Sequence, residues 1–167
     1  MTDKEYANGE AHYKLAKATN FDKKLFTARV KFTDSDMTYW WNNRICIGGS
    51  ASNGWGLSVV PSNNGESLLI CDADGEKIAA PQINKTIEAS KVGMDSFLGT
   101  EFILQMGYEY LDNNDVRVLV YVNGNEGLNT IVKNCNMDTL GEYVRVIIGN
   151  ESKIEVKSVD LPIKPVE

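Results

Sequence analysis

The residues best suited to chemistry in this sequence are aromatic and polar side chains that crowd into residues 37–49. Tyr39, Trp40 and Trp41 are adjacent there, and Arg44 follows two asparagines. Flat aromatic rings stack on the C–H faces of sugar rings, while amide and guanidinium groups form hydrogen bonds with hydroxyls. The segment therefore predicts a carbohydrate-binding surface.

Strand alternation assigns sides to these residues. If Ile45 points into a core, Trp41 shares its face, whereas Trp40 and Arg44 point outward. Trp40 is thus the better platform for a sugar ring. Trp41 either packs into the core or, together with Tyr39, extends that platform, and Arg44 is expected to bind hydroxyls.

A second candidate surface comes from two predicted strands, 102–110 and 116–122, which alternate apolar and polar residues. Tyrosine and arginine together are common on binding faces. The alternative is that these side chains form cross-strand contacts that only shield the sheet. Glu109 and Arg117 are expected to fix sugar hydroxyls, and Tyr121 to extend the aromatic platform. The full outward set comprises Gln105, Glu109, Arg117, Tyr121, Tyr143 and Arg145.

The same residues argue against catalysis. The single histidine, His12, lies near the N-terminus and is expected on a strand surface, so a Ser or Cys nucleophile lacks a suitable base. A retaining glycosidase needs two carboxyl groups roughly 5–5.5 Å apart. The pairs Glu109 with Asp112, and Asp112 with Asp115, lack the same-face spacing of a strand and fall in a predicted turn. No catalytic residue is assigned, although an unrecognised acid pair stays an alternative.

The sequence contains few motifs that indicate a bound cofactor. Gly48-Gly49-Ser50 is not followed by Gly-Lys-Ser or Gly-Lys-Thr, so it does not form a phosphate-binding loop, which argues against a nucleotide-dependent enzyme. Calcium could use the oxygen-rich turns at 72–76 and 112–115, but neither has the full EF-hand pattern. A structural calcium ion is therefore an open alternative, and no other cofactor is predicted. Cys46 and Cys71 lie in apolar runs and are expected to be buried, inert thiols.

The elements that must position these residues are strands. Clear alternation predicts strands over 26–32, 102–110, 116–122, 144–148 and 154–156, and Asn123-Gly124 predicts a tight hairpin. Only residues 84–92 are ambiguous between strand and helix. About a dozen strands suit an all-β fold, a two-sheet antiparallel β-sandwich of the jelly-roll type. Weaker strands are predicted at 11–17, 40–48, 55–60, 66–71, 77–79, 83–89 and 128–134.

Composition and length limit the class of protein and the kinds of partner that this chain can have. The 167 residues, 43% of them hydrophobic, fit one globular domain, and no stretch has the roughly 20 apolar residues that a membrane helix needs. The net charge of -6 argues against nucleic acids and anionic membranes as partners. We expect a polar lead at 1–10, one domain at 11–160 and a tail or the start of a linker at 161–167. No secretory signal is recognised, but a module of a secreted protein would have the same appearance.

The order of several segments resembles the concanavalin A-like lectin and glucanase superfamily, in particular laminin-G-like domains and bacterial carbohydrate-binding modules of that fold. The similar segments are 25–32, 43–49, 54–59 and 115–124. The resemblance covers about residues 11 to 160. It implies glycan binding on a concave sheet or at loop edges, in some members with calcium. Catalytic members carry Glu-x-Asp-x-x-Glu or Glu-x-Asp-x-Glu on one strand, which 101–110 and 117–123 lack, so the resemblance implies binding.

The sequence thus predicts a non-catalytic carbohydrate-binding module that binds a polysaccharide or oligosaccharide. An acidic module suits a neutral plant or dietary glycan better than a uronic-acid polymer. We expect it to be a monomer, tethered to other domains of a secreted bacterial protein and located outside the cell or on its surface. The alternatives are a protein-interaction or adhesion domain and a glycoside hydrolase of the same fold.

Overall fold

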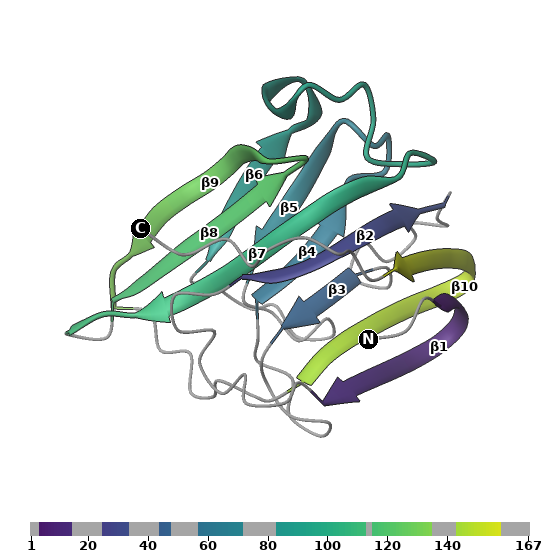
Figure 1. The fold of residues 1–167 in the computed structure, drawn as a ribbon, viewed down its shortest axis with the longest axis horizontal. Coiled ribbons are helices and arrows are strands. Elements are labelled where there is room, and N and C mark those ends of the chain that lie inside the picture. Colours follow the sequence, from purple (N-terminus) through teal and green to yellow (C-terminus); the bar gives the residue numbers. More distant parts are fainter. Residues whose placement is uncertain are drawn as a thin grey trace.

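The computed structural model describes residues 4–14, 25–33, 44–47, 57–71, 83–112, 115–134 and 143–157. Ten strands and one short 3-10 helix make up most of this part of the chain (Figure 1). Each neighbouring pair of strands is antiparallel. The elements are β1 (Lys4–Lys14), β2 (Phe26–Phe32), β3 (Arg44–Ile47), β4 (Leu57–Pro61), β5 (Ser67–Cys71), β6 (Asn84–Glu88), η2 (Ala89–Val92), β7 (Phe102–Tyr110), β8 (Val116–Val122), β9 (Asn125–Val132) and β10 (Tyr143–Lys157).

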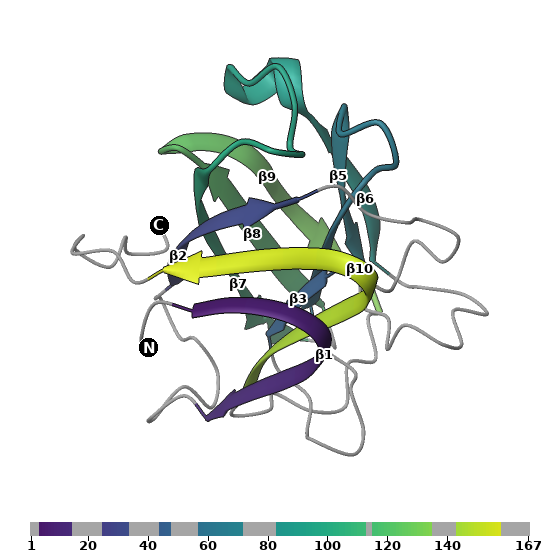
Figure 2. The same cartoon turned by 90° about the vertical axis from the view of Figure 1, so that its right-hand side faces the viewer.

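The strands form two layers that share β10. The order along the sheet is β6-β5-β4-β3-β10-β2-β7-β8-β9, with β1 paired to β10. Residues 144–147 of β10 pair with β3, whereas residues 154–157 pair with β2. β1 follows β10 on both sides of a bulge between Ala7 and Gly9. Figure 2 shows the two strands curving together from one layer to the other. The predicted two-sheet antiparallel β-sandwich is confirmed.

The core lies between the layers, where alternate residues of each strand meet. Phe26, Ala28, Val30 and Phe32 of β2 are buried, while Arg29 between them is exposed. Apolar burial stabilises by about 25 cal/mol per Å², so this alternation fixes which face of each strand turns inward. The facing layer contributes further core residues, Ile45, Leu57, Val59, Leu68, Ile70 and Ile87.

The sequence predicted most described strands within a few residues. The predictions over 26–32, 102–110 and 116–122 match β2, β7 and β8. The two series predicted near the C-terminus are one continuous strand, β10, and β1 begins at Lys4 rather than at residue 11. The ambiguous segment 84–92 divides into strand β6 and helix η2. The strand predicted at 77–79 lies outside the described residues.

The side of the sandwich away from β10 is closed by side-chain contacts. A Cβ atom on Gly127 of β9 would lie 2.9 Å from Cδ1 of Ile87 on β6, so the two strands approach closely. Lys91 Nζ donates to the Gly127 carbonyl at 2.9 Å, and Asn125 Nδ2 donates to the Val92 carbonyl at 3.2 Å. These bonds attach η2, which directly follows β6, to β9. In the described part of the chain, no helix is long and apolar enough to cross a membrane.

Candidate functional site

The outer face of β7 and β8 brings together the polar residues predicted from their alternation. Gln105 stands opposite Tyr121, and Glu109 stands opposite Arg117, in the antiparallel register of the two strands. The neighbouring residues along each strand, such as Leu104 and Val118, point into the core instead. Two polar cross-strand pairs therefore share one outer face; alternation predicted the side of each strand, and the register adds that the two strands are neighbours.

Exposure differs along this face. Glu109, Arg117 and Tyr121 are half-buried, so part of each side chain is accessible to a ligand. Gln105 is 7% exposed, and its Nε2 lies 3.5 Å from Thr27 Oγ1 on β2. The row between the two pairs is Gly107 opposite Leu119, and Leu119 is 2% exposed although its strand position is on the polar side. The two pairs thus flank a buried row.

The charges around this face are balanced. On β2, Arg29 Nε lies 3.3 Å from a carboxylate oxygen of Glu101, and Lys31 Nζ lies 3.9 Å from one of Glu155. The Arg117 position is likewise opposite an acid in the strand register. Each of these cations is matched with an acid, and Glu126 of β9 stands exposed opposite Tyr121, so the local field does not favour anionic ligands.

Arg44 lies on β3, in the other layer, and is not brought together with Glu109, Arg117 and Tyr121. Its neighbour Ile45 is in the core, so Arg44 is on the outward side of the strand, as predicted. Its side chain is nevertheless only 3% exposed. The predicted contact between Arg44 and a sugar hydroxyl stays a prediction. The predicted platform residues Tyr39, Trp40 and Trp41 lie outside the described residues.

The turn between β7 and β8 is fastened by Asp115. Its Oδ2 accepts a hydrogen bond from Lys133 Nζ at 2.8 Å, and its Oδ1 accepts one from the backbone N–H of Asn134 at 3.1 Å. The Lys133 hydrogen bond, followed by the Asn134 bond, lowers the pKa of Asp115 below its usual 3.8. The carboxylate of Asp115 therefore serves to connect the start of β8 to the end of β9.

The described residues contain no group of three or more His, Cys, Asp or Glu side chains placed to hold a metal ion. Of the two turns considered for calcium, residues 72–76 lie outside the described part. In the other turn, Asp115 makes the bonds described above. Cys71 is buried and free of disulfides, as predicted for an inert thiol.

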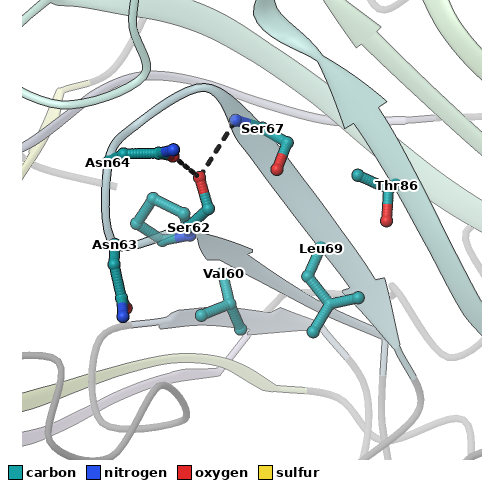
Figure 3. A pocket seen from close by; sticks show the side chains of 8 residues that line it. Val60, Ser62, Asn63, Asn64, Ser67, Leu69 and Thr86 are labelled. Atoms are coloured by element: carbon teal, nitrogen blue, oxygen red, sulfur yellow. Dashed lines mark hydrogen bonds between the residues drawn. The ribbon is translucent and has the colours of Figure 1, made fainter.

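A groove on the other layer was missed by the sequence analysis as a site. It has a volume of about 480 Å³ and lies where β4 turns into β5, beside β6. Its apolar part is formed by Val60, Pro61 and Leu69. Only the strand register could place the turn Ser62-Asn63-Asn64-Gly65 beside a β6 side chain. The polar lining consists of Ser62, Asn63, Asn64, Ser67 and Thr86 (Figure 3).

This chain is similar to solved protein structures but not to any family model or curated sequence. Among solved structures, the receptor binding domain of botulinum neurotoxin C/D mosaic serotype is similar over 94% of this chain, with a TM-score of 0.55 and 10% identity. The chain spans only 38% of that protein.

Two further solved structures of similar fold are proteins that bind saccharides. An alginate lyase solved in complex with dimannuronate is similar over 98% of this chain and 74% of its own, with a TM-score of 0.50 and 10% identity. A carbohydrate-binding module, CBM66 from Bacillus subtilis, matches over 93% of this chain and 83% of its own, with a TM-score of 0.47 and 10% identity. The two-layer sandwich described above is a concanavalin A-like fold, as the resemblance implied.

Proposed function

We propose that this chain is a non-catalytic carbohydrate-binding module that binds a neutral polysaccharide through the outer face of β7 and β8. The observation that carries the proposal is the register, which sets Gln105 against Tyr121 and Glu109 against Arg117. A tyrosine ring offers a surface for the C–H face of a sugar, while amide, carboxylate and guanidinium groups offer bonds to hydroxyls.

The preference for a neutral glycan follows from charge. The face carries acids matched with bases, at Arg29 with Glu101 and Lys31 with Glu155, and the whole chain has a net charge of -6. A polymer of uronic acids would be repelled overall and would find few unmatched cations. The alginate lyase of similar fold was solved with dimannuronate. That complex supports a saccharide as ligand for a sandwich of this kind, but dimannuronate is itself a uronic acid, so the neutral preference proposed for this chain rests on its charges alone.

The proposal includes the aromatic segment of the sequence. Trp40 supplies a stacking platform, extended by Tyr39 and Trp41, on the basis of residue type and strand alternation alone. The module belongs to a larger secreted bacterial protein, which it holds against its polysaccharide. Sugar sites of this kind exchange hydrogen bonds with water, so we expect modest affinity.

Affinity electrophoresis of the full chain in gels with β-glucan, xylan or galactomannan tests the proposal. We expect at least one polysaccharide to retard the wild type. Tyr121→Ala and Arg117→Ala should each weaken binding about tenfold, since a loss of about 1.4 kcal/mol corresponds to that factor. The control Lys85→Ala changes an exposed β6 residue and should bind as the wild type does.

Three results would contradict the proposal. Retardation by none of the polysaccharides would favour a protein-interaction or adhesion domain. Release of reducing ends, lost in Glu109→Gln, would show a glycoside hydrolase instead. Retardation that persists in Tyr121→Ala and Arg117→Ala but is lost in Trp40→Ala would move the site away from β7 and β8.

A further inference from the structure

We infer that the groove beside the β4–β5 turn is a second saccharide site, which takes a short neutral oligosaccharide. The inference rests on the proposed carbohydrate-binding function and goes beyond it, because β4, β5 and β6 form the opposite layer from β7 and β8. Figure 1 shows β9, β8, β7 and β2 side by side, with β6, β5, β4 and β3 behind them. The module would then bind two glycan segments on two faces.

The floor of the groove is one cross-strand row. Val60 of β4 is opposite Leu69 of β5, which in turn is opposite Thr86 of β6. Val60 is 1% exposed, Leu69 is half-buried and Thr86 is exposed, so the row rises from an apolar base to a hydroxyl at one side. Figure 3 shows Thr86 across the floor from the turn. Such a floor offers apolar contact to sugar C–H groups and a hydrogen bond at its margin.

The polar wall is held in place before any ligand arrives. Ser62 Oγ donates to Asn64 Oδ1 at 2.9 Å and accepts from the Ser67 N–H at 3.0 Å. Asn64 Oδ1 also accepts from the Glu66 N–H at 3.0 Å. These bonds occupy the carboxamide oxygen of Asn64, so its Nδ2 donors are directed to other partners. Binding to a wall that is already ordered costs less conformational entropy than ordering a loop.

The turn is also anchored to the body of the domain. The Phe97 N–H donates to the Gly65 carbonyl at 2.8 Å, and the Ala89 N–H donates to the Glu66 carbonyl at 2.8 Å. Phe97 is fully buried. The turn is therefore fixed at two consecutive residues by segments that come from the far end of β6 and beyond.

The chemistry of the lining selects an uncharged ligand. All eight lining residues are neutral, with three hydroxyls and two amides among them. The charged residue that pairs with the lining in the strand register is an acid, Glu88, which is exposed and stands opposite Ser67. An anionic ligand would meet repulsion there, and none of the eight lining residues is a cation that could match its charge, whereas hydroxyl groups can both donate to and accept from the lining. The volume of about 480 Å³ falls within the range of roughly 300–1,000 Å³ seen for small-ligand pockets.

The test is a titration of the 15N-labelled full chain, followed by NMR, with laminaritetraose, cellotetraose and xylotetraose, and with tetragalacturonate as an anionic probe. We expect at least one neutral probe to shift the backbone amides of residues 62–69 and the side-chain amides of Asn63 and Asn64. Thr86→Val retains the shape of the floor and removes its hydroxyl. It and Asn63→Ala should each weaken groove binding by about three- to tenfold.

The controls separate the two sites. Tyr121→Ala should leave groove binding intact, and Lys85→Ala, next to Thr86 on β6, should change neither site. If residues 105–121 shift with a neutral probe and residues 62–69 do not, the groove inference is wrong and the proposed function stands. If only the groove shifts, the assignment to β7 and β8 is wrong. Silence at both sites overturns both, and equal groove affinity for tetragalacturonate overturns the neutral selectivity.

Discussion

The outer face of β7 and β8 and the groove beside the β4–β5 turn are positioned by different kinds of interaction. The face takes its side chains from two long strands in the middle of a layer, and charged groups surround it. The turn next to it is fastened by the ion pair of Asp115 with Lys133. The groove is built around a turn held by neutral hydrogen bonds and by close packing. The face should therefore respond to salt and acid, and the groove to changes of shape.

The largest effect is expected from Gly65→Ala in the β4–β5 turn. Gly65 has φ +74°, and an added Cβ would collide with Ser96 Oγ and lie 3.2 Å from Leu98 Cβ. Left-handed backbone costs about 1–2 kcal/mol outside glycine, and overpacking adds about 1–3 kcal/mol, so the free energy of unfolding should fall by roughly 2–5 kcal/mol. Urea denaturation measures this change.

Gly124→Ala is the matched control. Gly124 has a similar φ of +79° in the β8–β9 hairpin, but no atom lies within 4 Å of its added Cβ. Only the backbone cost of about 1–2 kcal/mol should remain. Equal losses in the two variants would show that packing around the β4–β5 turn contributes nothing and would remove the contrast between the two regions.

A smaller effect is expected from the cross-strand pair on the other face. A double-mutant cycle with Glu109→Ala and Arg117→Ala should give a coupling energy of about 0.2–1 kcal/mol, because opposite charges that face each other across strands attract. The coupling should shrink in about 1 M salt, where the Debye length is about 3 Å. A zero coupling at low salt, or one that salt leaves unchanged, would contradict this account. The Gly65→Ala loss should not follow salt in this way.

The smallest effect concerns acid. The pKa of Asp115 is lowered below 3.8 in the folded chain by Lys133 and Asn134. Its contribution to stability is therefore fully present above pH 3.8 and is lost as the pH falls through the lowered value. Asp115→Asn should lower the melting temperature slightly at neutral pH and should match the wild type in strong acid. A gap between the two proteins that widens below pH 3.8 would have the wrong sign.

The sequence predicted the layers better than their connections. Alternation identified β2, β7 and β8 because apolar core residues on one face of each strand alternate with mostly polar residues on the other. Nothing in the alternation showed that residues 143–157 form one strand shared by two layers, since a bend changes pairing partners without changing the residue pattern. The burial of Leu119 was equally hidden, because parity assigns a face and says nothing of what covers it.

The same limit applies to the candidate site. Parity placed Gln105, Glu109, Arg117 and Tyr121 on one side of their strands, and the register confirmed that they are neighbours. Arg44 was grouped with them on residue type, yet it lies in the other layer and is 3% exposed. The groove was not predicted from the sequence because only the pairing of β5 with β6 brings Thr86 beside the β4–β5 turn.

The close approach of Gly127 to Ile87 affects whether copies of this domain can pair through their strand edges when they are crowded together. β6 and β9 end the main strand order, while β1 is a further edge beside β10, and unpaired strand edges are templates on which another chain can add a strand. Here the two ends meet, and Lys91 occupies a backbone carbonyl of β9. Many copies of this domain held close together on a polymer would therefore have fewer open edges through which to join into fibrils.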